Sequence, residues 1–190
     1  SPDYRKAIVA PDHMRKWFLR EVERTVEAHE AGLDTRIVLK MNSLVDPRSI
    51  RALYEASQAG VRVDVNVRGI CCLRPGVPGV SENIRVTSVV GRFLEHTRIF
   101  YFHNDGAEDV FLASADWMDR NFFRRIELCF PVLDAALKRR VIREGLQPYL
   151  DDNCQAWVMN PEGGYERLKP RRGRRRSAQE ELLFTLGIPT

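Results

Sequence analysis

The feature that most constrains the fold is a strand, a helix and a second strand that follow one another closely. Residues 35–41 (TRIVLKM) are mostly apolar, and residues 61–67 (VRVDVNV) alternate between apolar and polar side chains. Between them, Asp46 and Pro47 are typical of a helix start and Gly60 of a helix end. Because a helical crossover joins parallel strands, we expect two parallel neighbours with the helix packed on one face of the sheet.

The rest of the chain continues this alternation. Apolar residues recur at helical spacing from Asp12 to Gly32, which predicts an amphipathic helix with Asp12 as its N-cap. A second long helix is expected at 134–150, and Asp105 followed by Gly106 predicts a hairpin turn. The buried side of the second helix is expected to hold Leu137, Val141 and Leu146. Further strands are expected at 84–90, 98–103, 110–113, 125–132 and 154–159.

The composition changes after residue 160. Residues 1–160 are expected to form a single α/β domain, a mixed β-sheet flanked by helices, and residues 161–190 a basic linker with a short helix that opens on a capping box at 177–180. The run 171–176 supplies five of the 30 basic residues, and without it 25 basic residues face 26 acidic ones. The net charge of +4 is therefore local to this run, which can stay solvated or contact a polyanion.

Charge and cysteine patterns exclude several classes of protein. The longest stretch without Asp, Glu, Lys or Arg is nine residues, about half of the ~20 that cross a bilayer. The first residues are charged and lead into no apolar segment, so no secretory signal is expected. The four cysteines lack Cys-x-x-Cys spacing, so we expect reduced, mostly buried thiols and neither a disulfide framework nor a metal site. The expected location is the cytoplasm.

His96 and Arg98 form the most informative pair of residues. They precede an apolar strand two positions apart, and in an extended segment such residues point to the same side. An arginine there can clamp phosphate oxygens, and a histidine can exchange a proton near neutral pH. The alternative is structural: a histidine bonded to a carbonyl beside an arginine in an ion pair.

Arginines also occur in loops near the ends of other strands. Arg68 ends a strand and is followed by Gly69, and Arg74 lies in the same loop with Gly76 and Gly79. Backbone N–H groups in such turns can form a concave anion site, to which a guanidinium adds charge. The alternative is an ordinary surface loop that needs glycine for its turns.

Ser114, Asn121 and Arg124 follow another strand and can complete a phosphate site. In the alternative, Ser114 or Asp116 caps a turn, Trp117 fills a core position and the arginines form ion pairs. Lys40 and Asn42 are weaker candidates, at the end of the first strand. The chain has no Walker lysine loop, no Gly-x-Gly-x-x-Gly and no run of carboxylates suited to cage a metal. The residues thus favour phosphate chemistry without a Walker fold.

Six separate blocks, in order, resemble one known family. It is the C-terminal catalytic domain of bacterial polyphosphate kinase, the class that works through a phosphohistidine, and the resemblance runs from about residue 8 to residue 161. The blocks are Lys40 to Leu44 (KMNSL), Leu53 to Ser57 (LYEAS), Val67 to Leu73 (VRGICCL), Gly91 to His96 (GRFLEH), Ser114 to Met118 (SADWM) and Arg120-Asn121.

The resemblance implies a phospholipase D-like fold and one half of a shared active site. The family enzyme reversibly transfers the terminal phosphate of ATP, with Mg2+, to inorganic polyphosphate. Arg68 and His96 match positions that contact the nucleotide phosphates, and His96 is implied to be the catalytic acid/base. The phosphorylated histidine belongs to the preceding domain, and none of the other histidines, His13, His29 and His103, lies in a matching block.

The resemblance also implies ligands and partners. They are ATP or ADP, polyphosphate, the preceding domains of the same polypeptide and further copies in a homo-oligomer; nucleic acid is not expected. Mg2+ would be held mainly by residues outside this chain, which is expected in the cytoplasm or peripherally at the inner membrane. Arg98, Ser114, Asn121 and Arg124 remain candidate phosphate ligands, and the run 171–176 gains interest as a polyphosphate docking segment.

Two other functions stay open at this point. One is a stand-alone polyanion-binding module, and the other is a phospholipase D-like phosphodiesterase that works as a homodimer. Against the phospholipase D pattern His-x-Lys-x-x-x-x-Asp, Arg98 replaces the lysine and His103 stands where the aspartate is needed. This departure argues against independent phosphodiesterase chemistry.

Overall fold

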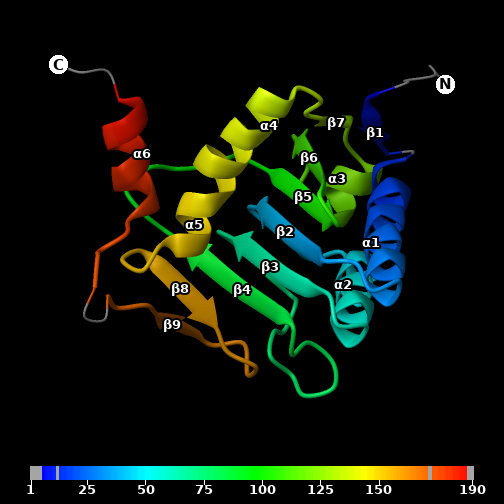
Figure 1. The fold of residues 1–190 in the computed structure, drawn as a ribbon, viewed down its shortest axis with the longest axis horizontal. Coiled ribbons are helices and arrows are strands. Elements are labelled where there is room, and N and C mark those ends of the chain that lie inside the picture. The colour runs from blue at the N-terminus through cyan, green and yellow to red at the C-terminus, as the bar shows by residue number, and fades with distance from the viewer. Residues whose placement is uncertain (1–5, 12, 171–172, 188–190) are drawn as a thin grey trace.

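A single mixed β-sheet organises the computed structural model, which describes residues 6–11, 13–170 and 173–187 (Figure 1). The described part of the sheet has nine strands in the order β1-β7-β6-β5-β2-β3-β4-β8-β9. The strands are β1 Ile8–Ala10, β2 Thr35–Met41, β3 Arg62–Val67, β4 Ile84–Val89, β5 Ile99–Asn104, β6 Ala107–Ala113, β7 Glu127–Pro131, β8 Ala156–Met159 and β9 Tyr165–Arg167. The helices are α1 Met14–Glu30, α2 Pro47–Gln58, α3 Asp119–Phe123, α4 Ala135–Val141, the π-helix η1 Ile142–Leu146, α5 Gln147–Asp151 and α6 Ala178–Leu186.

The predicted crossover is confirmed. Strands β2 and β3 are parallel neighbours joined by α2. The Asp46 carboxylate caps α2 by accepting hydrogen bonds from the backbone N–H and the hydroxyl of Ser49, both at 2.8 Å. Gly60 ends the crossover helix at a φ of +103°, where an added Cβ would lie 2.6 Å from His29 Nε2, so only glycine fits.

The predicted hairpin is also confirmed. Asp105 and Gly106 have φ values of +49° and +84° and connect β5 to β6. Because β5 pairs antiparallel with β2 on the side away from β3, the sheet is mixed and forms one domain with its helices. Strand β6 begins at Ala107, a few residues before the predicted start.

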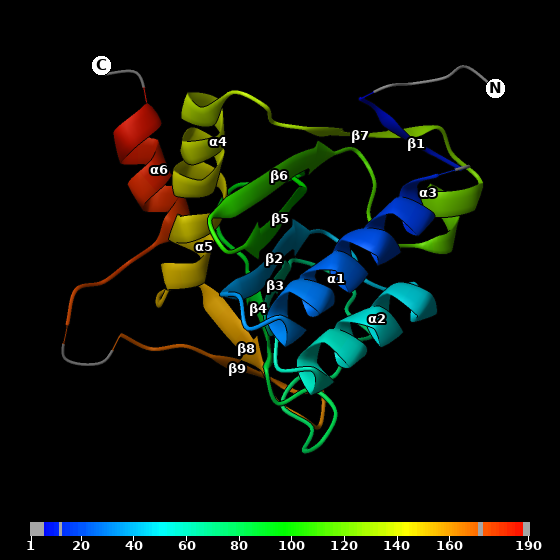
Figure 2. The same cartoon turned by 45° about the vertical axis from the view of Figure 1, so that its right-hand side comes forward.

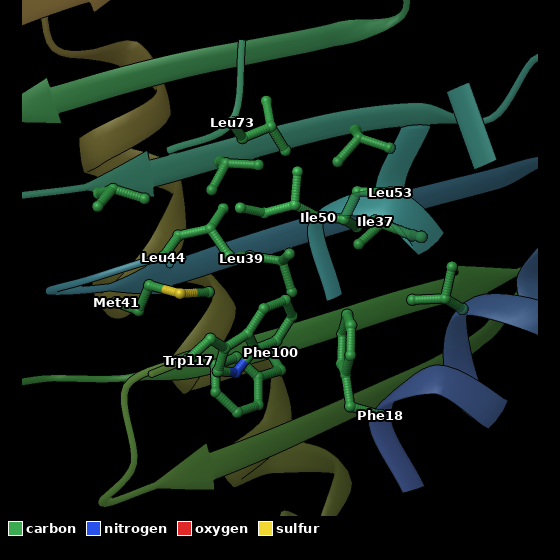
Figure 3. Packing of buried hydrophobic residues seen from close by; sticks show 14 of the residues in the cluster. Phe18, Ile37, Leu39, Met41, Leu44, Ile50, Leu53, Leu73, Phe100 and Trp117 are labelled. Carbon is green, nitrogen blue, oxygen red and sulfur yellow. The ribbon is translucent and has the colours of Figure 1, made fainter. Parts of the chain in front are cut away.

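Helices cover both faces of the sheet (Figures 1 and 2). The larger core lies under α1 and α2, where Phe18 and Leu53 pack on side chains such as Leu39 and Trp117 (Figure 3). Trp117 is only 1% exposed, which confirms the core position considered for it. Burying each such side chain contributes about 1.5–3 kcal/mol. On the opposite face α4, η1 and α5 cover a smaller cluster that includes Leu146.

The helix expected at 134–150 is confirmed as one helical stretch from Ala135 to Asp151, although its middle part is π-helical. A π-helical segment, η1, separates α4 from α5, and Pro148 has no N–H to donate to a regular helical ladder. Gly145 allows η1 to touch Ile99, which a Cβ would prevent. Leu146 is buried as predicted, but Leu137 is 54% exposed, so its predicted burial is wrong: α4 carries no buried residue.

The segment after residue 160 contains structure that the sequence did not reveal. Residues 165–167 form β9 and pair antiparallel with β8, inside the stretch expected to be a linker. The helix predicted after Ser177 is present as α6, but the Ser177 hydroxyl makes no capping bond. Instead the backbone N–H of Ala178 donates to Asp152 Oδ2 at 2.8 Å. The predicted cap of the first helix, Asp12, lies outside the described residues.

Candidate active site

One edge of the sheet gathers the candidate residues. In the parallel pair Met41 lies beside Val67, and in the antiparallel pair Lys40 lies beside Ile99. Arg68 therefore leaves the sheet at the edge from which β5 enters it, and the segment with His96 precedes β5 there. Strand β6 ends and β7 begins at the same edge, which places the segments around residues 114 and 127 beside them.

The loops that follow β2, β3 and β6 at this edge lie side by side. Leu44, after β2, bridges to Cys71 after β3 and to Trp117 after β6. The Gly69 N–H donates to the Asn42 carbonyl at 2.9 Å, and a Cβ at Gly69 would lie 2.8 Å from that oxygen. Glycine is thus required by close backbone packing, and the loops form a firm base for the site.

Arg68 is half-buried and is oriented by Asn42. Its Nε donates to Asn42 Oδ1 at 3.2 Å. Among the residues that the structure describes, its two Nη groups have no hydrogen-bond partner, so they retain donors for an anion. Lys40 lies near enough that the positive charge of Arg68 contributes to lowering the pKa of Lys40, after burial, which is the larger cause.

His96 lies in an irregular segment, because β5 begins at Ile99 and not at residue 98. Its side chain is exposed, and its backbone carbonyl accepts a hydrogen bond from Arg98 Nη1 at 2.8 Å. The Arg98 fork binds Asp116, with Nε 3.2 Å from Oδ1 and Nη2 2.9 Å from Oδ2. Arg98 therefore forms the ion pair of the structural alternative and does not share an open face with His96.

Asp116 is a residue whose importance the sequence reasoning underrated. Besides Arg98, its Oδ1 accepts the backbone N–H of Asn42 at 2.7 Å and that of Ser43 at 3.2 Å. It therefore links the end of β2 to the entry of β5. The sequence considered Asp116 only as the cap of a local turn, whereas the backbone groups that its carboxylate accepts are 74 and 73 positions away.

Ser114 and Asn121 come together, but around a carboxylate. The Ser114 hydroxyl hydrogen-bonds to Glu127 Oε2 and accepts the Leu128 N–H at 3.0 Å, and Asn121 Nδ2 donates to Glu127 Oε1 at 2.6 Å. The Ser114 hydroxyl and the Asn121 Nδ2 thus join β6, α3 and β7, whereas Asn121 Oδ1 is buried without a hydrogen-bond partner among the described residues. Arg124 is exposed at the end of α3.

The glycine loop after β3 does not form the expected anion concavity. The N–H of Gly69 is taken by Asn42, and that of Gly76 donates to the Ser81 carbonyl at 2.8 Å. Arg74 turns away from the site, with Nη1 donating to the Pro161 carbonyl at 3.2 Å. The surface-loop alternative describes this segment, and Arg68 is its one contribution to the edge.

A buried ion pair that the sequence analysis missed lies beside His96. Lys40 Nζ donates to Glu95 Oε2 at 2.7 Å and sits 3.5 Å from the centre of the Tyr149 ring. Burial lowers the pKa of Lys40, which Glu95 only partly offsets. Burial alone would raise the pKa of Glu95, but Lys40 and hydrogen bonds from Tyr149 and Gln179 hold it below its usual range. The Glu95 carboxylate is therefore ionised at neutral pH.

The described residues do not offer a site for a resident metal ion. They contain no group of three or more His, Cys, Asp or Glu side chains placed to hold one. The four cysteines are unpaired thiols, with Cys129 and Cys154 buried and Cys72 exposed. Burial raises the pKa of the Cys71 thiol to about 11, which leaves it protonated and a poor nucleophile at neutral pH.

The basic run 171–176 is only partly described, because residues 171–172 lie outside the described residues. Arg176 forms ion pairs with Asp151 at 2.7 Å and Glu181 at 3.5 Å. Thus the end of the run lies against the folded body. No helix within the described residues is both long and apolar enough to cross a membrane.

The architecture defines the class of fold. The phospholipase D family member Nuc from Salmonella typhimurium superposes with a TM-score of 0.59 at 15% identity, covering 82% of this chain and 97% of Nuc. At this identity the similarity concerns the fold alone. The phospholipase D-like mixed sheet flanked by helices, expected from the sequence, is confirmed.

The family follows from closer similarities. The model of "Polyphosphate kinase C-terminal domain 2" matches residues 7–179. A polyphosphate kinase of Neisseria meningitidis serogroup B is 52% identical over 181 residues, 95% of this chain and 26% of that protein. The crystal structure of polyphosphate kinase from Porphyromonas gingivalis gives a TM-score of 0.93 at 41% identity, covering 98% of this chain and 28% of that one. The chain belongs to the polyphosphate kinase C-terminal domain 2 family, and it spans about a quarter of these relatives' length.

Proposed function

We propose that this chain supplies the phosphate-binding and acid/base half of a polyphosphate kinase active site. The reaction is reversible transfer of the terminal phosphate of ATP to inorganic polyphosphate. The observation that carries the proposal is the convergence of Arg68 and His96 at one edge of the sheet. Support comes from the relatives named polyphosphate kinase, of which the chain covers about a quarter. The phosphorylated histidine then belongs to a preceding domain of the same polypeptide.

Arg68 is proposed to hold the phosphate groups. Its guanidinium is permanently charged, and the bond from Nε to Asn42 fixes its position while its Nη groups keep their donors. A fixed positive charge at a half-buried position stabilises the negative charge on the equatorial oxygens of a phosphoryl group in transfer. Arg124, which is exposed, is a second candidate ligand.

His96 is proposed to move the proton. In one direction the imidazolium donates a proton to the departing phosphate oxygen as the phosphoryl group passes to the nucleophile, and in the reverse direction the neutral imidazole takes that proton back. The exposure of the side chain lets a substrate reach it. Arg98, Ser114 and Asn121 act indirectly in this account, through Asp116 and Glu127.

ATP enters this account as a substrate with Mg2+, which is proposed to be held mainly by residues outside this chain. We also infer a cytoplasmic enzyme that assembles as a homo-oligomer. Docking of polyphosphate on residues 171–176 is a further part of the proposal. Deleting that run should then weaken salt-sensitive polyphosphate binding, and unchanged binding would remove this part.

The test uses the full-length enzyme. His96→Ala should lower kcat for ATP-dependent polymerisation by about 10²–10⁴-fold, the usual contribution of an acid/base group. His103→Ala is the matched control, because His103 lies near the end of β5 and pairs with Arg36 at the start of β2, at the opposite edge of the sheet. A wild-type rate for His96→Ala would refute the assigned role. A simple polyanion-binding module would instead show no dependence on His96 in any assay.

A further inference from the structure

The segment that carries His96 lacks the support of a β-ladder. Residues 91–98 form no helix or strand, and their apolar side chains face solvent, with Phe93 45% and Leu94 69% exposed. A catalytic imidazole on such a segment needs other contacts to hold it in place, because small displacements of a reacting group cost large factors in rate.

One side chain from the far end of the chain supplies those contacts. Gln179, on α6 and only 7% exposed, hydrogen-bonds to both the N–H and the carbonyl of Phe93. The Phe93 N–H donates to Gln179 Oε1, and Gln179 Nε2 donates to the Phe93 carbonyl, each at 2.9 Å. Gly91 leaves space for the Gln179 side chain, because a Cβ at Gly91 would collide with the Gln179 amide. The side chain thus pairs with the segment as a neighbouring strand would.

The same amide reaches the residue next to His96. Gln179 Nε2 also donates to Glu95 Oε1 at 2.8 Å, although the two residues are 84 positions apart. The hydroxyl of Tyr149 donates to the same oxygen at 2.7 Å, and Lys40 holds the other oxygen at 2.7 Å. Glu95 is therefore fixed from β2, α5 and α6 at once, which restrains the backbone of the adjacent histidine.

The start of α6 is itself anchored. Asp152, which follows α5, accepts the Ala178 N–H with Oδ2 at 2.8 Å, while its Oδ1 accepts three backbone N–H groups at the start of the β8 segment. Asp152 is 2% exposed, and α6 lies beside α5 (Figure 2). The position of Gln179 is consequently set by the body of the domain.

We propose that Gln179, together with Glu95, is a positioning residue for the acid/base histidine, and that docking of α6 completes this half of the active site. The inference rests on the proposed role of His96. Gln179 contacts neither phosphate nor nucleotide in this account. Its loss should affect the chemical step far more than the binding of ATP.

The experiment compares variants of the full-length enzyme. Gln179→Ala should lower kcat by about ten- to a hundredfold while KM for ATP changes less than about twofold, because the reacting group is displaced and the phosphate ligand Arg68 is not. Hydrogen exchange at the Phe93 amide should accelerate in the same variant. The control is Gln147→Ala, which removes an exposed glutamine whose side chain, among the described residues, hydrogen-bonds to Asp151 alone.

The outcomes separate this inference from the proposed function. A wild-type kcat for Gln179→Ala, with His96→Ala inactive, overturns the positioning role and leaves the role of His96 intact. A wild-type rate for His96→Ala overturns both. If Gln179→Ala does not fold, Gln179→Glu keeps the shape and the acceptor for Phe93 but removes both Nε2 donations. A kcat for Gln179→Glu equal to that of the wild type would then refute the inference.

Discussion

Glu95 and Glu127 lie at the same edge of the sheet, but different kinds of partner hold them. Glu95 accepts a charged bond from Lys40 and neutral ones from Tyr149 and Gln179. These partners come from elements far apart in sequence, so the cluster forms only when the whole domain has folded. Lys40 is the cation of this cluster, and it helps to hold the pKa of Glu95 below its usual range beside the candidate catalytic segment.

Glu127 is 9% exposed and is held locally. Within the described residues its donors are the Ser114 hydroxyl and the Asn121 amide, both neutral and within 13 positions of it. This cluster ties β6, α3 and β7 into one corner. The difference teaches that the two groups of polar side chains have distinct tasks: one fixes a functional segment, and the other closes a structural corner.

The largest expected effect comes from removing the cation of the first cluster. Lys40→Met keeps the aliphatic bulk but leaves the mostly buried Glu95 without its charged partner, which should lower the free energy of unfolding by about 3 kcal/mol. Urea unfolding measures it. A double variant, Lys40→Met with Glu95→Gln, should recover part of the loss. A cost below about 0.5 kcal/mol for the single variant would show that the pair is not coupled.

Acid should weaken the same cluster. The folded pKa of Glu95 lies below its ordinary value of 4.5, although burial alone would raise it. Its contribution to stability is therefore complete above 4.5 and is lost as the pH falls through the lowered folded pKa. The difference in unfolding free energy between wild type and Glu95→Gln should shrink on acidification. A difference that stays constant across the acid range would contradict the charged pairing.

The smallest effect is expected at the second cluster. Glu127→Gln keeps an oxygen that accepts from Asn121 and leaves no cation unpaired, so it should cost about 1 kcal/mol, the scale of one hydrogen bond. Thermal or urea unfolding beside Lys40→Met gives the comparison. If Glu127→Gln costs as much as Lys40→Met, the proposed division between a charged and a neutral cluster is wrong.

Local signals in the sequence predicted the regular part of the fold. The Asp46 cap, the Asp105-Gly106 turn and the alternation in β3 each act within a few residues, and the structure confirms them. The three residues of β9 are all exposed, so they lack the apolar alternation that identifies a strand. The π-helical segment reflects Pro148 and the fit of Gly145 against β5. The helical spacing of apolar residues in the sequence does not reveal either feature.

The candidate site was predictable only in part. The positions of Arg68 and His96 follow from the order of strands and from the family resemblance. The engagement of Arg98 by Asp116 and of Glu95 by Gln179 depends on contacts across long stretches of sequence. Spacing alone left open whether Arg98 binds phosphate or forms an ion pair, because the phosphate interpretation treats residues 96–98 as regular extended chain, whereas the chain is irregular there.

The most direct measurement exposes this 190-residue chain to ATP with Mg2+ and to polyphosphate, follows binding by calorimetry, and then searches the same sample for labelled phosphate. The account predicts saturable binding that Arg68→Gln weakens, with no transfer and no label on the protein. Covalent labelling of the chain, or transfer by the chain alone, would contradict the central claim that this domain provides the binding and acid/base half of the site and not the nucleophile.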